Sequence, residues 1–138
     1  MSIFVLKKLE AVTGKQQFFE LVVDGKSQFD SYCQKVKENN QYYSELLKIF
    51  TLMNLVAQLK MLPKTKFRDI TPAKEDVKEY EFKSAHLRIY AFHVEKTGKV
   101  VAYGGYKNSQ DDDIARFRSF KSRYFKNLQN DNPKRINK

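Results

Sequence analysis

The sequence lacks the features of a secreted or membrane-bound protein. Its one cysteine, Cys33, cannot form an intramolecular disulfide and does not indicate a metal cluster. No apolar run approaches the roughly 18 residues of a membrane-spanning helix. The opening segment, MSIFVLKKLE, has no basic leader followed by a sustained apolar stretch, which argues against a secretory signal. We therefore expect a cytoplasmic protein with no membrane partner, no metal site and no cofactor.

Acidic residues are scarce relative to basic ones. The chain of 138 residues carries 26 Lys and Arg against 16 Asp and Glu, a formal net charge of +10. The excess is concentrated between Ile114 and Lys138, where eight basic residues face one acidic residue, Asp131. Such a balance favours a polyanionic partner, most often nucleic acid or the ribosome and sometimes an acidic protein.

Length and composition predict one folded domain. The apolar fraction of 41%, with 11 Phe and 8 Tyr, is enough to build a core in a chain of this size. We expect the domain to span residues 1–128, with residues 1–24 as an N-terminal β extension, and a basic flexible tail at residues 129–138. In the extension, the β-rich runs SIFVLKK and FFELVVDG flank a TGKQQ turn, which indicates a hairpin.

Two amphipathic helices are expected after this hairpin. Ser27 is a candidate N-cap with Asp30 three residues on, and Cys33 lies in the apolar stripe that follows. A second helix is predicted from about Tyr42 to Leu59. The short KENNQ interruption between the two helices predicts an αα-hairpin.

Three short strands and a last helix complete the predicted fold. After the polar loop KTKFRDITPAKED, strands are expected at about Val77–Lys83, Leu87–Val94 and Lys99–Tyr106. The final helix begins near Gln110, with an acidic triple at 111–113 in its first turn, where carboxylates favour the helix dipole. The predicted fold class is α+β: a small twisted antiparallel sheet with an N-terminal helical hairpin and a C-terminal helix, the helices packed on one face of the sheet.

Three short motifs carry a resemblance to a known family. They are Glu81-Phe82-Lys83 at the end of one strand, Arg88-Ile89-Tyr90 at the start of the next, and Tyr106-Lys107-Asn108-Ser109-Gln110 before the last helix. In spacing and element order they resemble the RelE/ParE toxin superfamily, most closely its HigB-like branch, over roughly Leu46 to Phe125. Lys83 stands where the family usually has Arg, Asn108 where a second Lys is usual, and Ser109 where Thr is usual.

The resemblance implies a RelE-like toxin of a type II toxin–antitoxin pair. Most such toxins are ribosome-dependent endoribonucleases that cut messenger RNA in the decoding site. A cognate antitoxin protein, usually one that also binds DNA, neutralises them. The ParE side of the superfamily instead poisons DNA gyrase and is not a nuclease. The partners implied here are therefore an antitoxin, the ribosome and messenger RNA.

Metal-free RNA cleavage needs cations beside the phosphate and a group that moves protons. We predict Arg88, Lys83 and Lys107 as clamps on the charged transition state, because a guanidinium binds phosphate oxygens bidentately and fixed cations stabilise developing charge. We predict His86 as general acid or base, since an imidazole changes charge near neutral pH. Tyr106 is predicted to stack on a base or to donate a proton.

Each of these residues also has a structural interpretation. His86 is compatible with an ordinary polar residue at a turn, and Tyr106 with a packed aromatic beside the Gly-Gly step of its strand. Glu81 is expected to form a structural ion pair with Lys83 or Arg88, and a role as a base stays open. We predict ribosomal RNA contacts from three residues of the last helix: Arg116, Lys121 and Arg123. Lys121 falls on the apolar stripe, so its side chain either snorkels to the surface or reaches the cation cluster.

Three functional hypotheses follow from the sequence. The first is a ribosome-dependent endoribonuclease toxin, the second a non-enzymatic gyrase inhibitor like the ParE branch, and the third a basic nucleic-acid-binding domain. The His86 and Arg88 pair and the stretch at Lys107 favour the nuclease. The identity of the general base, the codon preference, the antitoxin and the oligomeric state stay open at this point.

Overall fold

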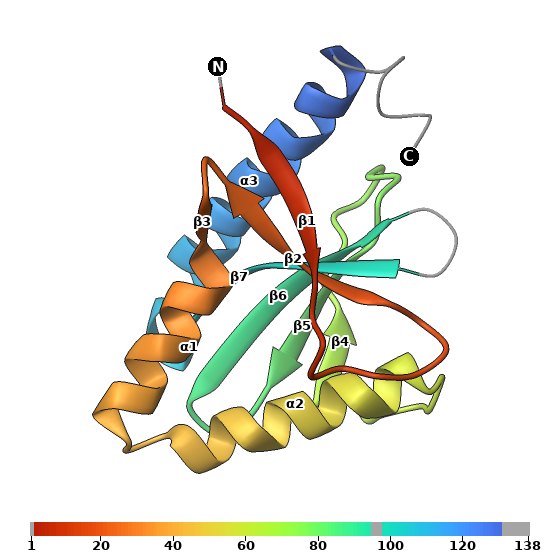
Figure 1. The fold of residues 1–138 in the computed structure, drawn as a ribbon. Helices are drawn as coiled ribbons and strands as arrows, with labels where there is room; N and C mark the ends of the chain where they lie inside the picture. Colours follow the sequence, from red (N-terminus) through yellow and green to blue (C-terminus); the bar gives the residue numbers. More distant parts are fainter. Residues whose placement is uncertain (1, 95–97, 131–138) are drawn as a thin grey trace.

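The chain has an α+β fold. The computed structural model describes residues 2–94 and 98–130. The predicted class, with a sheet, an N-terminal helical hairpin and a C-terminal helix, is confirmed (Figure 1). No helix within the described residues is long and apolar enough to cross a membrane. The elements follow in the order β1 (Phe4–Lys8), β2 (Phe18–Val23), β3 (Lys26–Ser27), α1 (Gln28–Asn39), α2 (Tyr43–Ala57), β4 (Phe67–Asp69), β5 (Glu79–Lys83), β6 (Leu87–Val94), β7 (Gly98–Tyr106), a 3-10 turn η1 (Lys107–Ser109) and α3 (Gln110–Asn130).

A single sheet joins the N-terminal hairpin to the later strands. Its strand order is β1-β2-β7-β6-β5-β4, with β3 paired to β2. Neighbouring strands are antiparallel except β2 and β7, which run parallel, with Phe18–Glu20 paired to Lys99–Val101. The sequence predicted the hairpin and the β5-β6-β7 meander but not this parallel pairing, so the expectation of a purely antiparallel sheet was wrong at this one step.

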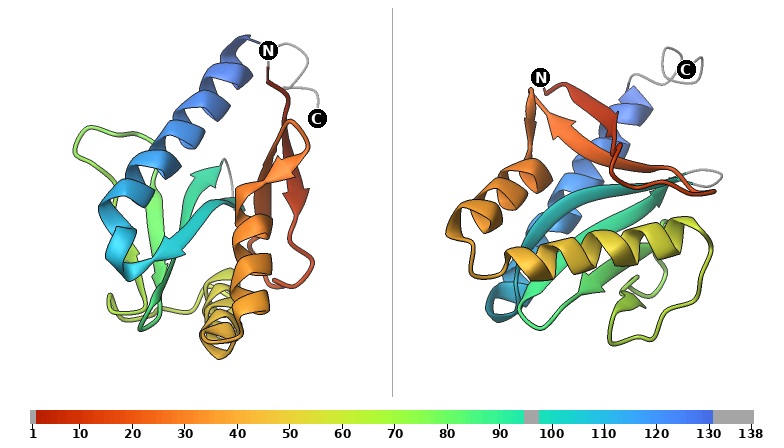
Figure 2. Two further views of the ribbon diagram at one scale, coloured as in Figure 1. Left: turned by 90° about the vertical axis from the view of Figure 1, so that its left-hand side faces the viewer. Right: turned by 60° about the horizontal axis from the view of Figure 1, so that its bottom comes forward.

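Helices cover both faces of the sheet. Leu87, Ile89 and Ala91 of β6 pack into a core beneath α1 and α2, whereas Tyr90 and Phe92 pack into a second core beneath α3. Successive side chains of a strand point to opposite faces, so a central strand that is apolar throughout is buried on both. The expectation that all helices lie on one face was therefore wrong: α3 lies across the sheet from α1 (Figure 2).

Local signals set the ends of α1 and α2. The Ser27 side-chain oxygen accepts a hydrogen bond from the backbone N–H of Asp30 at 2.9 Å, which confirms the predicted N-cap. Asn40 ends α1 in the left-handed region, at φ 65°. The second helix ends at Ala57, two residues before the predicted end, because Leu59 also lies at positive φ (66°) and cannot continue it.

Two short strands and the end of α3 differ from the sequence expectation. β3 and β4 were not predicted, since they have two and three residues and β4 lies in a segment read as a polar loop. Phe67 of β4 pairs with Phe82 in register, and its ring also stacks on Tyr80. The predicted tail began at residue 129, but α3 continues through Asn130. The remainder of that tail and residues 95–97 lie outside the described residues.

Two glycines of β7 allow helices to approach the sheet closely. A Cβ on Gly104 would overlap the Tyr32 ring of α1, and a Cβ on Gly105 would overlap the Asp113 carboxylate at the start of α3. Asp113 is buried there and accepts a hydrogen bond from Ser109 at 2.6 Å. The acidic triple thus lies in the first turn of α3, as predicted.

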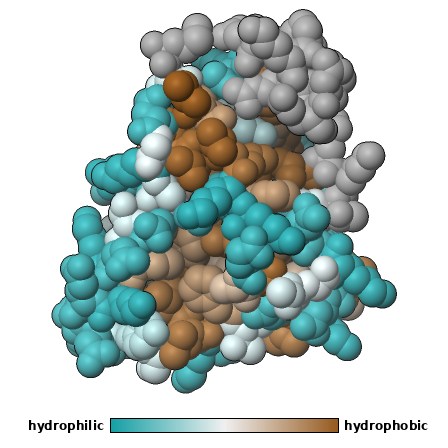
Figure 3. All heavy atoms as spheres, viewed as in Figure 1, coloured by the Kyte–Doolittle hydropathy of each residue, from teal (hydrophilic) through white to brown (hydrophobic). Residues whose placement is uncertain are grey.

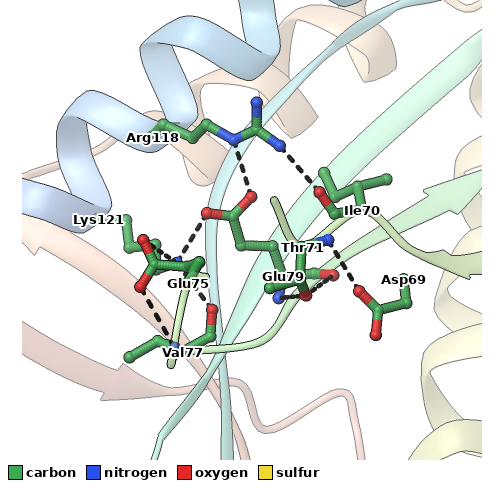
Figure 4. A network of polar contacts seen from close by, with 8 residues as sticks. All are labelled: Asp69, Ile70, Thr71, Glu75, Val77, Glu79, Arg118 and Lys121. Carbon is green, nitrogen blue, oxygen red and sulfur yellow. Dashed lines mark hydrogen bonds and ion pairs between the residues drawn. The ribbon is translucent and has the colours of Figure 1, made fainter. Parts of the chain in front are cut away.

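A buried ionic network fastens α3 to β5. The Glu79 carboxylate accepts hydrogen bonds from Arg118 Nε at 2.8 Å and from Lys121 Nζ at 2.7 Å (Figure 4). Lys121 also donates to the Val77 carbonyl at 2.8 Å, and Arg118 to the Ile70 carbonyl at 2.9 Å. A charge as deeply buried as Glu79 is tolerated only with such partners.

We expect Lys121→Ala to lower the free energy of unfolding by roughly 3 kcal/mol, the cost of leaving a buried charge without one of its partners. Lys126→Ala, which removes an exposed lysine of the same helix, should change stability by less than about 0.5 kcal/mol. Urea denaturation of both variants measures the difference. Equal stability of the two variants would show that Lys121 does not hold α3 to β5.

Candidate functional site

Most of the predicted catalytic residues meet at one end of the sheet. This end is formed by the β5–β6 turn, the end of β7 and η1, with the start of α2 beside it. The backbone N–H of Lys107 donates to the His86 carbonyl at 2.9 Å and so ties η1 to the turn. Lys83 faces Arg88 across the β5–β6 ladder, and Leu87 faces Tyr106 across the β6–β7 ladder.

His86 is held by an acidic residue and an aromatic ring. Its Nδ1 lies 2.7 Å from Glu45 Oε2, and its backbone N–H donates to Glu45 Oε1 at 2.8 Å. The Tyr42 ring stacks on the imidazole with centroids 4.5 Å apart. The side chain nevertheless stays 54% exposed, so its second nitrogen is accessible to a substrate. A histidine oriented by a carboxylate on one nitrogen is an arrangement suited to proton transfer at the other.

Glu45 remains ionised in this setting. Burial alone would raise the pKa of Glu45, but hydrogen bonds from the Ser84 hydroxyl and from the side chain and backbone of His86 outweigh it and hold the pKa below its ordinary value. The carboxylate therefore offers a fixed negative charge beside the imidazole.

Tyr106 lies on the α1–α2 side of the sheet, within an aromatic group. Its ring is 6.1 Å from Tyr42 and 5.8 Å from Tyr32, measured between centroids. Burial raises the pKa of Tyr106, so its hydroxyl stays protonated at neutral pH. Tyr32 donates a hydrogen bond to the Gly105 carbonyl at 2.8 Å and fixes the strand that carries Tyr106. Tyr106 is therefore both a packed aromatic and a partly exposed hydroxyl donor.

Arg88 is largely buried and bound to the protein's own backbone. Its Nη1 donates to the Ser84 carbonyl at 2.6 Å and to the Leu87 carbonyl at 2.8 Å, and its side chain is 7% exposed. Its Nε lies 4.0 Å from the Glu81 carboxylate, which also accepts a hydrogen bond from Arg68 at 3.0 Å. The predicted ion pair of Glu81 with Arg88 is thus present, and the shorter pair, with Arg68, was not predicted. In this conformation Arg88 shapes the β5–β6 turn rather than presenting an open fork to solvent.

The two lysines of the predicted clamp lie on either side of this turn. Lys83, half-buried, shares with Arg88 the sheet face that α3 covers. Lys107 is exposed in η1, next to the turn that carries His86. The predicted residues therefore form two subsets at one end of the sheet: the cations Lys83 and Arg88 on one face, and His86 with Tyr106 on the other.

The three predicted RNA contacts of α3 have different surroundings. Arg116 is 62% exposed and lies near Asp113, and Arg123 is exposed over the rings of Phe4 and Phe120. Lys121 is buried with Glu79, so it neither snorkels to the surface nor joins the cluster at the sheet end. We correct that assignment: Lys121 binds Glu79, because a β-strand carboxylate that sequence reading did not pair with it lies directly beneath it.

Sequence reasoning missed Glu45 and Tyr42, the two residues that hold His86. Both lie at the start of α2, about 40 positions before the histidine. Their spacing of three places them on one helical face, but this does not identify their partner. Among residues 2–94 and 98–130, there is no group of three or more His, Cys, Asp or Glu side chains that could hold a metal ion.

Searches against family models, curated protein sequences and solved structures found no match to this chain. The resemblance to RelE/ParE toxins therefore rests on the three motifs, and the chemistry has to be argued from the residues themselves.

Because its folded-state pKa is lowered, Glu45 stabilises the folded protein above its ordinary pKa of 4.5, and this contribution is lost as the pH falls through the folded-state value. We expect Glu45→Gln to be less stable than the wild type by about 1 kcal/mol at pH 7, and the difference to shrink at pH 3. Urea denaturation at the two pH values measures it. The other carboxylates contribute equally to the stability of the two proteins, so their effects cancel in the comparison. A stability difference that is the same at pH 3 as at pH 7 would contradict the role given to Glu45.

Proposed function

We propose that this protein is the toxin of a type II toxin–antitoxin pair and acts in the cytoplasm as a ribosome-dependent, metal-free messenger RNA endoribonuclease. The observation that carries the proposal is the exposed His86, fixed by Glu45 and stacked on Tyr42, at the sheet end where Lys107 and Tyr106 also lie. The three sequence motifs that resemble RelE/ParE toxins converge on the same end. The implied partners are a cognate antitoxin, the ribosome and messenger RNA.

In the proposed reaction, the 2′-hydroxyl of a nucleotide attacks the neighbouring phosphorus and the bond to the 5′-oxygen of the next nucleotide breaks. His86 accepts the proton of the 2′-hydroxyl on the nitrogen that faces solvent. The Glu45 carboxylate at Nδ1 stabilises the imidazolium that results. We assign the Tyr106 hydroxyl, which is protonated at neutral pH, as the group that gives a proton to the departing oxygen.

The phosphate carries extra negative charge in the transition state, and cations of the sheet end offset it. Lys107 is exposed and free to swing onto a phosphate bound beside His86. The Lys83 ammonium would reach this phosphate from the other face of the sheet, the one toward α3. Arg88 contributes its positive charge from beneath the turn, and direct bidentate contact would require it to release the Ser84 and Leu87 carbonyls.

We expect His86→Asn to lower ribosome-dependent cleavage by about 10²- to 10⁴-fold, the usual contribution of a positioned acid or base. Asparagine can still donate a hydrogen bond to Glu45, so the turn should stay folded. Primer extension on a defined messenger RNA, with and without programmed ribosomes, measures the cuts.

The matched control is Gln34→Ala on the exposed side of α1, which should cut like the wild type. A folded His86→Asn variant that cuts at the wild-type rate would remove His86 from the mechanism. Tyr106→Phe in the same assay tests the proton donor separately.

We expect the double change Arg116→Ala and Arg123→Ala to weaken ribosome binding and to reduce the salt dependence of that binding. Each lost phosphate contact should lower the slope of log affinity against log salt by about 0.7 to 0.9. Sedimentation with ribosomes at several salt concentrations measures the slope. Lys35→Ala with Lys48→Ala, two exposed lysines of α1 and α2, serves as the control for net charge. An equal slope change in both double variants would contradict a specific contact by α3.

A non-enzymatic gyrase inhibitor is the second candidate, and the burial of Arg88 favours it. A guanidinium bound to two carbonyls of its own turn supports a fold more directly than it supports phosphate binding. If the wild type makes no cuts with or without ribosomes, a supercoiling assay with DNA gyrase is the next measurement. Inhibition there would replace the nuclease proposal, and its absence would leave the third hypothesis, a basic nucleic-acid-binding domain.

A further inference from the structure

Ser84, in the turn between β5 and β6, contacts both subsets of the candidate site. Its hydroxyl donates a hydrogen bond to Glu45 Oε1 at 2.5 Å, and Glu45 is the residue that holds His86. Its backbone carbonyl accepts a hydrogen bond from Arg88 Nη1 at 2.6 Å. One residue therefore joins the carboxylate that orients the imidazole to the buried guanidinium of the other subset.

Glu45 is turned away from solvent, unlike most hydrophilic side chains of its surface. On the face that carries β1, α1 and α2, hydrophilic side chains border the apolar ones (Figure 3). The Glu45 side chain, in the first turn of α2, is only 15% exposed and is directed at the β5–β6 turn. A carboxylate held this far from water requires hydrogen-bond donors. Ser84 and His86 supply them.

The two oxygens of the Glu45 carboxylate have different partners. Oε1 accepts from the Ser84 hydroxyl at 2.5 Å and from the His86 backbone N–H at 2.8 Å. Oε2 lies 2.7 Å from His86 Nδ1. Rotation of the carboxylate would break both bonds to Oε1, so these bonds keep Oε2 on the imidazole. Of the two donors to Oε1, only the Ser84 hydroxyl belongs to a side chain and can be removed by substitution.

The Ser84 hydroxyl is itself fixed by the turn. Its oxygen accepts a hydrogen bond from the Leu87 backbone N–H at 3.2 Å, and the Ser84 N–H donates to the Leu87 carbonyl at 3.1 Å. A serine hydroxyl has one proton to donate, and here it goes to Glu45. Burial raises the pKa of Glu45, and the hydrogen bond from Ser84 is the largest of the effects that lower it. The hydroxyl is thus the main side-chain support of the ionised carboxylate.

We propose that Ser84 is a positioning residue of the candidate site: its hydroxyl fixes the Glu45 carboxylate against His86, and its carbonyl holds Arg88 at the same turn. Ser84 acts through Glu45 and does not contact the substrate. Its role in cleavage rests on the proposed nuclease function, whereas its control of the carboxylate does not. Threonine, which keeps the hydroxyl, should replace it, and alanine should not.

A carbon-13 NMR titration of the Glu45 carboxyl in the full-length protein tests the control of the carboxylate. Ser84→Ala keeps the carbonyl that binds Arg88, so the turn should stay folded. We expect the pKa of Glu45 to rise in Ser84→Ala and to keep its wild-type value in Ser84→Thr. His86 faces Glu45 in every variant, so its effect cancels.

The matched control is Ser44→Ala, the same change at an exposed serine beside Glu45 in α2. It should leave the pKa of Glu45 at the wild-type value. A Glu45 pKa in Ser84→Ala equal to that of the wild type would overturn the inference, and so would an equal rise in Ser44→Ala.

Primer extension with programmed ribosomes tests the role of Ser84 in the reaction. We expect Ser84→Ala to lower the cleavage rate at saturating ribosome concentration by about 10- to 100-fold, the usual effect of losing a partner that orients a reacting group. The half-saturating ribosome concentration should stay unchanged, because the substitution alters the chemical step and not binding. Ser84→Thr should restore the rate, and Ser44→Ala should cut like the wild type.

The outcomes separate this inference from the proposed function. If the wild type cuts and Ser84→Ala cuts equally fast, or if Ser84→Thr fails to restore the rate, the inference is wrong and the nuclease proposal stands. If the wild type makes no cuts with or without ribosomes, the nuclease proposal fails and the role of Ser84 in cleavage fails with it. The titration of Glu45 then still decides whether Ser84 controls the carboxylate.

Discussion

The parallel pairing of β2 with β7 is the constraint on which the rest of the architecture depends. It inserts the N-terminal hairpin into the same sheet as the β5-β6-β7 meander, so the chain between β2 and β7 has to leave the sheet and return. The helical hairpin of α1 and α2, which lies in this part of the chain, packs on one face of the sheet. The opposite face is left to α3, which explains why β6 and β7 are buried on both sides. The same pairing places Glu20 between two neighbouring strands and under the helical pair.

Burial on both faces leaves the two carboxylates of β5, Glu79 and Glu81, almost without contact with water. Glu79 and Glu81 point toward α3, whereas Tyr80 and Phe82 point to the other face, and both carboxylates are almost completely buried. The basic residues Arg118 and Lys121 offset Glu79, and Arg68 offsets Glu81, with Arg88 close by. Two of these cations, Arg88 and Lys121, are therefore buried, whereas the side chains of Arg68 and Arg118 are 42% and 39% exposed. Net charge overstates the positive charge that a nucleic acid would meet, since it counts buried and exposed cations alike.

The local parts of this structure could be predicted from the sequence, and the long-range parts could not. Ser27 as an N-cap, Leu87–Val94 as a central strand and the start of α3 at Gln110 depend on neighbours within a few positions. The β2–β7 pairing joins segments about 80 residues apart, and no pattern within either strand specifies it. Lys121 illustrates the same limit at a single residue: its stripe position was recognised, but its role depends on Glu79, 42 positions earlier. In the candidate site, His86 was found because it stands two residues before Arg88, and Glu45 was missed because it lies 41 positions before His86.

The division of the candidate site between two faces has a chemical consequence. His86, the group proposed to move protons, lies with the aromatic rings of the helical hairpin, and the fixed guanidinium of Arg88 lies beneath the turn. A phosphate at the sheet end would contact Lys107 and His86 directly. Its interaction with Arg88 would be electrostatic and without direct contact, because the backbone of the turn lies between them. Interactions of this kind fall off slowly in a protein interior of low dielectric, so a buried cation can stabilise developing charge without touching it. Under the proposed function, lysine at position 83 is compatible with such a site, because a mobile ammonium suffices where no bidentate geometry is used.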